Sequence, residues 1–134
     1  MSDRKVVRVR EVMKDKFDLV DGMTTVQDVL VKMKHVDTKC VIIDKRHADD
    51  EYGILLISDI AKQVLAKDRA PERVNVYEVM SKPVITVDGD MDIRYCARLF
   101  DKFGLSRAPV IDNGKVVGVV SFTDMVLQGM INRL

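Results

Sequence analysis

The most constraining feature of this sequence is an internal repeat at an offset of 67 positions. Val9-Arg10-Glu11-Val12-Met13 returns as Val76-Tyr77-Glu78-Val79-Met80, and Val20-Asp21-Gly22 returns as Val87-Asp88-Gly89. Between positions 9 and 30, seven of 22 residues are identical to the residue 67 positions later. The repeat indicates two copies of one supersecondary unit, each too small to close a core alone. We therefore expect the copies to pack on each other, with clefts at the seam between them.

Each copy predicts the element order strand–helix–strand–strand–helix. Apolar residues recur at helical spacing after each Val-Asp-Gly, as Val26, Val29, Leu30 and Met33 and as Ile93, Cys96, Ala97 and Phe100. Two apolar runs that predict strands follow in each copy, and a Ser-Asp or Thr-Asp pair then predicts the start of a second helix. The strands are expected at Cys40–Asp44, Gly53–Ile57, Ala108–Asp112 and Gly118–Phe122, and the second helices at Ile60–Ala66 and Met125–Ile131.

This alternation predicts an α+β fold. We expect helix N-caps at Thr24 or Thr25 and at Asp90 or Asp92, and a two-residue type I′ hairpin turn at Asn113-Gly114. The predicted boundaries are an N-terminal arm at 1–8, a first repeat at 9–66, a linker at 67–75 and a second repeat at 76–131.

The composition excludes several classes of protein. Basic residues number 22 and acidic residues 21, and a net charge of +1 argues against electrostatic binding of nucleic acid. No apolar run approaches the roughly 20 residues that span a bilayer, and the basic N-terminus lacks the apolar stretch of a signal peptide. Two cysteines do not make a disulfide framework. We therefore expect a soluble cytoplasmic protein with no nucleic-acid or membrane partner.

The order, spacing and duplication of these segments resemble the cystathionine-β-synthase (CBS) domain pair, also called a Bateman module. Each copy opens near Glu-Val-Met and closes on Gly, two hydrophobic residues, three further residues and Asp, and the resemblance extends over residues 9–131. The more specific segments lie in the second copy, at Met80–Val87, Leu105–Asp112 and Gly118–Asp124. The resemblance implies two tandem CBS repeats with pseudo-twofold symmetry, packed through their sheets, and two clefts that commonly bind adenosine-containing ligands.

The resemblance also assigns roles to residues of the second copy. Asp124 would bond the ribose hydroxyls and Ser121 would face a phosphate. A carboxylate can accept hydrogen bonds from two vicinal hydroxyls. A serine just before a helix lies at the helix N-terminus, where the unpaired N–H groups and the helix dipole favour an anion. The wall that borders base and phosphate would consist of Ile85, Thr86, Ser106, Arg107, Ala108 and Pro109.

The first copy keeps Asp59 in the place of Asp124 but lacks most of the other groups. Leu56 replaces Ser121 and removes its hydroxyl. We therefore predict one well-formed site per chain, closed by Asp124, and a weaker second cleft at Lys39, Cys40 and Asp59. The remaining differences are Val41 for Pro109 and Lys39-Cys40 near the position of Ser106-Arg107, where the alignment slips by one residue.

Simpler interpretations exist for each of these groups. Asp59 and Asp124 suit a helix N-terminus without any ligand, which is the favoured interpretation of Asp59. Cys40 and Cys96 are expected to be small buried hydrophobes. No Walker loop, dinucleotide fingerprint or zinc spacing is present, so we expect neither a metal site nor an enzyme. The basic segment Arg4, Lys5, Arg8 and Arg10 predicts a solvated arm or, alternatively, one that reaches a phosphate or a partner subunit.

Two functions from different classes fit this sequence. The first is a regulatory module that binds AMP, ADP or ATP, with S-adenosylmethionine, NAD or a cyclic dinucleotide as less favoured ligands. Such a module would signal through an unknown effector protein. The alternative is a ligand-independent assembly domain whose apolar helix faces form a homodimer.

Overall fold

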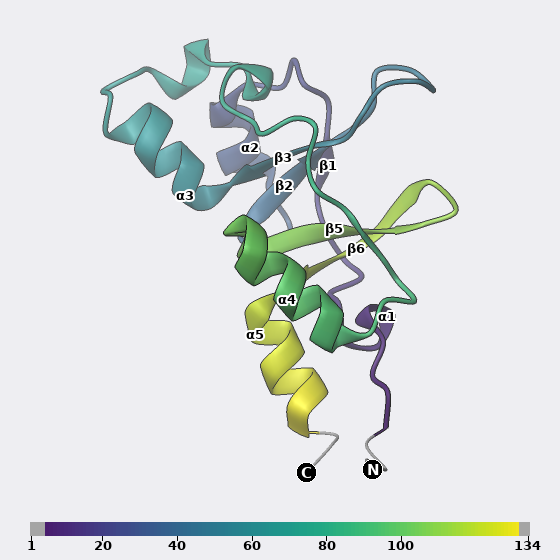
Figure 1. Cartoon of the computed structure of the whole chain (residues 1–134). Coiled ribbons are helices and arrows are strands. Elements are labelled where there is room, and N and C mark those ends of the chain that lie inside the picture. Colours follow the sequence, from purple (N-terminus) through teal and green to yellow (C-terminus); the bar gives the residue numbers. More distant parts are fainter. Residues whose placement is uncertain (1–4, 132–134) are drawn as a thin grey trace. The chain divides into compact units, whose positions relative to one another are not determined.

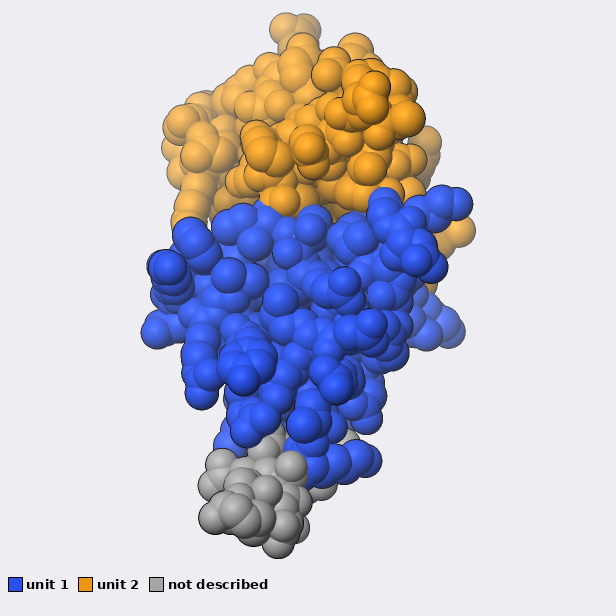
Figure 2. Space-filling model, turned by 45° about the vertical axis from the view of Figure 1, so that its right-hand side comes forward, with its two compact units in different colours: residues 1–16, 85–134 blue, residues 17–84 orange. Residues whose placement is uncertain are grey.

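The computed structural model describes residues 5–131, and the chain forms two compact units (Figures 1 and 2). Unit 1 comprises residues 1–16 and 85–134, and unit 2 comprises residues 17–84. The opening segment of the chain thus belongs to the same unit as the second half of the sequence. The repeat boundaries and the pseudo-twofold relation between the copies stay predictions from the sequence.

Unit 2 contains one three-stranded sheet in the order β1-β2-β3, with β1 parallel and β3 antiparallel to β2. Its helix α2 lies between β1 and β2 in the sequence, and α3 follows β3 directly and continues as the π-helical η2. The bounds are β1 Leu19–Val20, α2 Val26–Lys32, η1 Val36–Thr38, β2 Cys40–Ile43, β3 Gly53–Leu56, α3 Ile57–Ile60, η2 Ala61–Leu65, η3 Pro71–Arg73 and η4 Val76–Glu78.

Unit 1 contains an equivalent three-stranded sheet in the order β4-β5-β6, with β4 parallel and β6 antiparallel to β5. Figure 1 shows its strands β5 and β6. The short helix α1 from the start of the chain completes the unit. The strand–helix–strand–strand–helix order and the α+β class are therefore confirmed. The bounds are α1 Val9–Val12, β4 Val87–Asp88, α4 Ile93–Phe103, β5 Arg107–Asp112, β6 Lys115–Ser121, α5 Phe122–Asp124 and η5 Met125–Met130.

Each sheet buries apolar side chains against the helix that follows its first strand. In unit 1, Ile93, Cys96 and Phe100 of α4 are buried, as the helical spacing predicted. In unit 2, Val26 and Val29 of α2 are buried, but Leu30 is half exposed. The first two predicted positions of α2 therefore face the core, whereas Leu30 contributes an apolar surface.

The first helix of each copy begins at a predicted cap. Thr25 Oγ1 accepts a hydrogen bond from Asp28 N (3.1 Å), and Asp92 Oδ1 accepts one from Arg94 N (2.9 Å). The Asn113-Gly114 turn is also confirmed, because both residues have the positive φ of a type I′ turn, 52° and 77°.

The second helices begin three residues earlier than predicted, at Ile57 and Phe122 instead of Ile60 and Met125. The reason is that the last strand residue acts as the N-cap. Ser121 Oγ accepts from Asp124 N (3.1 Å), so Asp124 occupies the third position of α5. Thr123 and Asp124, which were predicted to precede the helix, therefore lie in its first turn.

The opening segment of each sequence copy packs on the strands of the other copy. Within unit 1, the Glu-Val-Met segment of the first copy bonds to the Val-Asp-Gly turn and to β6 of the second copy. The backbone hydrogen bonds are Val9 N to Met91 O (2.8 Å), Arg10 N to Gly89 O (3.0 Å) and Lys14 N to Val119 O (2.9 Å).

Unit 2 repeats this arrangement with the residues 67 positions away. The bonds are Val76 N to Thr24 O (2.8 Å), Tyr77 N to Gly22 O (3.0 Å) and Ser81 N to Ile54 O (2.9 Å). The two repeated motifs are thus partners: each Glu-Val-Met segment binds the Val-Asp-Gly turn that comes from the other copy.

The described part of the predicted N-terminal arm takes part in this packing. Val7 is buried in the core of unit 1, and its carbonyl accepts from Ile93 N (2.9 Å). Arg10 forms ion pairs with Asp90 and Asp112. Lys5, Arg8 and Arg10 are exposed, as expected of a solvated arm, but Arg8 and Arg10 are also held to unit 1 by hydrogen bonds to Asp90; Arg4 lies outside the described residues.

Two glycines allow the opening segments to approach the strands. A Cβ on Gly118 would lie 2.6 Å from the carbonyl oxygen of Lys14 and 2.6 Å from Met13 Sδ. A Cβ on Gly53 would lie 3.3 Å from the carbonyl oxygen of Ser81 and 2.9 Å from the flexible Met80 Sδ. The glycine that opens each closing motif is therefore required by close backbone approach.

The strand register corrects one detail of the sequence alignment. Pro109 pairs with Val119, and Ile42 pairs with Ile54 in the same position of the other sheet. The counterpart of Pro109 is therefore Ile42 instead of Val41. The offset of 67 continues through β2 and β5, so Cys40 corresponds to Arg107.

Substituting Gly118 by Ala should destabilise the protein more than substituting Gly53 by Ala. The added methyl group at Gly118 meets rigid backbone, and overpacking of this kind costs about 1–3 kcal/mol. At Gly53 the closest atom is the end of a flexible methionine. Urea unfolding of both variants measures the two losses, and an equal or larger loss for Gly53→Ala would contradict this account.

Candidate functional site

The carboxylate of Asp124 is the centre of the predicted site, and it is buried at the start of α5. Its Oδ2 accepts from Ser121 N (3.0 Å) and from Ser121 Oγ (2.9 Å). Only 7% of the Asp124 side chain is exposed. Two bonds from one neighbour fix the orientation of this carboxylate and leave Oδ1 directed elsewhere.

Asp124 Oδ1 pairs with the ammonium group of Lys14, a residue that sequence reasoning missed. The Lys14 backbone is itself held by two hydrogen bonds to Val119 in β6, each 2.9 Å long. The side chain of Lys14 is one third exposed. The exchange of opening segments thus brings a cation from the start of the chain to a carboxylate 110 residues later.

The sequence held one signal for Lys14, namely its place directly after Glu-Val-Met. Its repeat counterpart is Ser81, which pairs with Ile54 as Lys14 pairs with Val119. The sequence shows that lysine and serine differ at this position. It does not show which carboxylate the lysine reaches, because that depends on the strand against which the segment packs.

The other predicted residues gather at the same end of the unit 1 sheet. Arg107 begins β5 and is the register partner of Ser121, the last residue of β6. Ser106 O accepts from Phe122 N (3.3 Å). Thr86 directly precedes β4, which runs parallel to β5, so it lies at this end as well.

The burial of these residues differs strongly. Ala108 and Pro109 are buried in β5, so their side chains belong to the core. Ser106, Thr86 and Ile85 are exposed. The structure therefore brings Thr86, Arg107, Ser121 and Asp124 together at one end of a sheet, whereas Ala108 and Pro109 support that end from inside.

The corresponding end of unit 2 has fewer polar groups. Asp59 Oδ2 accepts from Leu56 N (3.0 Å), and Leu56 offers no hydroxyl. Lys39 has a left-handed backbone (φ 58°), and its carbonyl accepts from Ile57 N (3.0 Å). Cys40 is buried at the start of β2. Within residues 5–131, Asp59 has no ion-pair partner comparable to Lys14.

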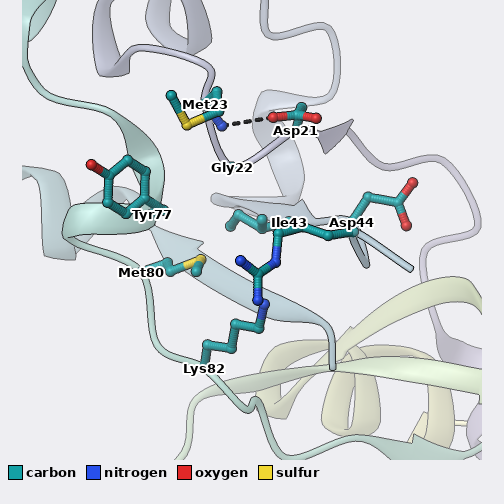
Figure 3. Close-up of a pocket in the computed structure, with 9 residues that line it drawn as sticks. Asp21, Gly22, Met23, Ile43, Asp44, Tyr77, Met80 and Lys82 are labelled. Atoms are coloured by element: carbon teal, nitrogen blue, oxygen red, sulfur yellow. Dashed lines mark hydrogen bonds between the residues drawn. The ribbon is translucent and has the colours of Figure 1, made fainter. Parts of the chain in front are cut away.

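A pocket of about 530 Å³ in unit 2 lies at the opposite end of its sheet (Figure 3). The residues that line it lie at or after the ends of β1 and β2, or within and after η4, and none was predicted as a site residue. Sequence reasoning missed this pocket because it depends on which residues the exchanged segment carries. Its lining includes Met23, Ile43, Tyr77 and Met80 together with charged side chains.

The cysteines and acidic groups do not form a reactive or metal-binding cluster within the described part of the chain. Cys40 and Cys96 are both buried, and burial raises the pKa of Cys96 to about 11. Among residues 5–131, no three His, Cys, Asp or Glu side chains gather closely enough to hold a metal ion. No helix in that range is long and apolar enough to cross a membrane.

Comparison with known proteins identifies relatives of the whole arrangement. The sequence matches the CBS domain family over residues 76–128. The hexameric CBS-CP12 protein from bloom-forming cyanobacteria is 32% identical in sequence, and its structure matches with a TM-score of 0.88. That match covers 95% of this chain and 74% of the cyanobacterial chain.

A protein from Methanopyrus kandleri is 31% identical over 113 residues, which is 81% of this chain but only 57% of that protein. This chain therefore spans little more than half the length of that relative. The CBS domain pair of protein MJ0100, solved in complex with 5′-methylthioadenosine and S-adenosyl-L-methionine, has the same fold, with a TM-score of 0.79 at 22% identity.

Replacement of Ser121 by Ala should lower the free energy of unfolding by about 1 kcal/mol, because an N-cap hydroxyl is lost. Replacement of the exposed Thr123 by Ala should change it by less than about 0.5 kcal/mol. Chemical denaturation of the two variants compares these positions. A larger loss at Thr123 would mean that the sequence-predicted cap is the true one.

Proposed function

Because this chain belongs to the CBS domain family, we propose that it is a regulatory module that binds an adenine nucleotide at the Asp124 end of unit 1. The observation that carries this proposal is the buried Asp124 carboxylate, oriented by Ser121 and paired with Lys14. Oδ1 of Asp124 can accept from a ligand that displaces Lys14, and the displaced ammonium group then lies beside the same ligand.

The ribose would bind to Asp124 by exchange with Lys14. Oδ2 stays bonded to Ser121, while Oδ1 exchanges the ammonium group for ribose hydroxyls, which donate to a carboxylate through charge-assisted bonds. The displaced ammonium then faces the phosphates of the same ligand. Binding in this way leaves no buried charge without a partner.

This exchange changes the role predicted for Ser121. Its hydroxyl holds Asp124 and caps α5 in the structure, so it is already engaged in two hydrogen bonds. Lys14 and Arg107 are better suited to the phosphates, because both are cationic and Arg107 lies opposite Ser121 in the ladder. Two cations favour AMP, ADP or ATP over the cationic S-adenosylmethionine or a neutral nucleoside.

The ligand class rests on the family and on this chemistry together. The MJ0100 domain pair was solved with two adenosine compounds, which supports adenosine as the shared recognition element. NAD contains the same ribose with both hydroxyls free and is a further candidate, whereas a cyclic dinucleotide keeps only one of the two hydroxyls and is disfavoured. We infer no turnover of the ligand, and the signal would pass to an effector protein through a shift between conformations.

A second candidate function is self-association. Four large apolar side chains near the end of the chain are about half exposed, namely Val126, Leu127, Met130 and Ile131. A structural relative is described as hexameric, which supports a homodimer or larger assembly. A thermal-shift panel of adenine nucleotides separates the functions, since a ligand at 100 times its Kd stabilises by about 2.7 kcal/mol. A flat panel with an intact oligomer favours assembly alone.

Titration calorimetry with ATP should give one site per chain. Binding should be largely lost in Asp124→Ala, because the ribose acceptor is removed, and little changed in Asp59→Ala. The second variant is the matched control, since both aspartates occupy the third position of a helix. Loss of binding in Asp59→Ala with binding retained in Asp124→Ala would sink the assignment.

Lys14→Ala should weaken ATP binding about tenfold or more, because a charge-assisted hydrogen bond contributes about 1.5–3 kcal/mol. Adenosine should bind as well as before or better, since its competitor for Asp124 is gone. Ser81→Ala, at the repeat-equivalent position, should alter neither affinity. Equal weakening of ATP and adenosine by Lys14→Ala would show that Lys14 acts on the fold and not on phosphate.

A further inference from the structure

The unit 2 pocket lies at the end of its own sheet that is opposite to Asp59. It is bordered by residues at or after the ends of β1 and β2 and by the segment that begins at Tyr77, whereas Asp59 follows the other end of β3. With a volume of about 530 Å³ it falls in the range of small-molecule sites. It is therefore a candidate small-molecule site in its own right.

At the equivalent end of the unit 1 sheet, an ion cluster of Arg10, Asp90 and Asp112 occupies the position of the pocket. Arg10 binds Asp90 at 2.6 Å and Asp112 at 2.5 Å, and this contact holds the pKa of Asp90 below its usual value. A Cβ on Gly89 would already touch Arg10 and Asp112. The guanidinium group thus fills the corner between the turn and the strand end.

At the offset of 67, all three members of this cluster differ in unit 2. Tyr77 stands for Arg10, Met23 for Asp90 and Lys45 for Asp112. Lys45 lies over the ring of Tyr52 (5.0 Å), so it does not bridge the corner. The concerted change removes a closed ion cluster and leaves an open pocket with an apolar side.

The apolar side is more exposed than core packing requires. Tyr77 is 50% and Met23 67% exposed, and neither belongs to the core of unit 2. Figure 3 shows Tyr77 and Met80 on one side of Ile43 and the Asp44 carboxylate on the other. An aromatic ring beside thioethers favours a flat or branched apolar group.

The charged side offers both signs. Asp21 Oδ1 accepts from Met23 N (2.7 Å) and Asp44 Oδ1 accepts from Lys45 N (2.8 Å). Within residues 5–131, the Oδ2 atoms of Asp21 and Asp44 have no hydrogen-bond partner. Both carboxylates can therefore accept from a cationic group of a ligand.

The two cations of the lining share one carboxylate. Lys82 Nζ lies 2.8 Å from Asp50 Oδ1, and Arg46 Nε lies 3.2 Å from Asp50 Oδ2. The hydrogen bond from Lys82 keeps the pKa of Asp50 far below its usual value, so Asp50 stays ionised. Arg46 uses only Nε in this contact, which leaves its two outer nitrogens to bind an anion.

We propose that this pocket binds an apolar α-amino acid. The ammonium group would bind Asp21 and Asp44, the carboxylate would bind the outer nitrogens of Arg46, and the side chain would lie against Tyr77 and Met80. Asp21, Asp44 and the ionised Asp50 outnumber the cations Arg46 and Lys82 by one charge, which disfavours an anionic nucleotide in this pocket.

The test is titration of the full chain with L-phenylalanine, L-leucine and L-methionine, followed by methyl NMR of the methionines. Saturable shifts are expected for Met23 and Met80. Phenethylamine and N-acetyl-L-phenylalanine, which each lack one charge, should bind at least tenfold more weakly than L-phenylalanine. Absence of saturable binding by all three amino acids would overturn the proposal. Binding of either analogue as tightly as L-phenylalanine would overturn it as well.

Tyr77→Arg should abolish this binding, because it removes the aromatic ring of the pocket and adds a cation that competes with the ligand's ammonium group for Asp21 and Asp44. Tyr95→Arg, at a similarly exposed tyrosine of unit 1, is the matched control and should leave it unchanged. Asp21→Asn keeps the acceptor for Met23 N and should weaken L-phenylalanine about tenfold. Asp124→Ala should not affect it, so the two proposed sites can fail separately. Amino-acid binding that survives Tyr77→Arg would place it elsewhere.

Discussion

The structure depends on the backbone pairing between each opening segment and a strand from the other sequence copy. Lys14 pairs with Val119 in unit 1 and Ser81 pairs with Ile54 in unit 2, each through two hydrogen bonds. Gly118 and Gly53 make the approach possible. Since a three-stranded sheet with two helices buries little apolar surface alone, these segments complete each unit. Val7, Val9 and Val12 belong to the core of unit 1, and Val74 and Val76 to that of unit 2.

The exchange also makes both proposed sites composite. Each end of a sheet receives side chains from its own copy and from the opening segment of the other. Lys14 therefore meets Asp124, and Tyr77 borders the corner next to Gly22. The two copies differ beside these shared segments, where Tyr77 corresponds to Arg10 and Ser81 to Lys14, because the backbone bonds do not restrict the side chains. One fold thus provides a polar, ion-paired end in unit 1 and an open, partly apolar corner in unit 2.

Much of the fold could be predicted from the sequence, because helical spacing, caps and the Asn113-Gly114 turn are local signals. The start of α5 was predicted three residues late, since Thr123-Asp124 is a plausible cap by itself and only the strand register reveals Ser121 as the cap. The grouping of Thr86, Arg107, Ser121 and Asp124 followed from the family resemblance. Lys14 could not be predicted, because its partner lies 110 residues away and depends on the exchange. The unit 2 pocket was missed for the same reason, because Tyr77 reaches it only through the exchange of opening segments.

The central claim is that Asp124 Oδ1 exchanges Lys14 for the ribose of an adenine nucleotide. A crystal structure of the full chain with ATP tests it most directly. The account predicts ribose hydroxyls on Asp124 Oδ1, Ser121 still bonded to Oδ2, and the Lys14 ammonium turned to a phosphate oxygen. A nucleotide bound through Asp59, or one bound while Lys14 stays on Asp124, would contradict it.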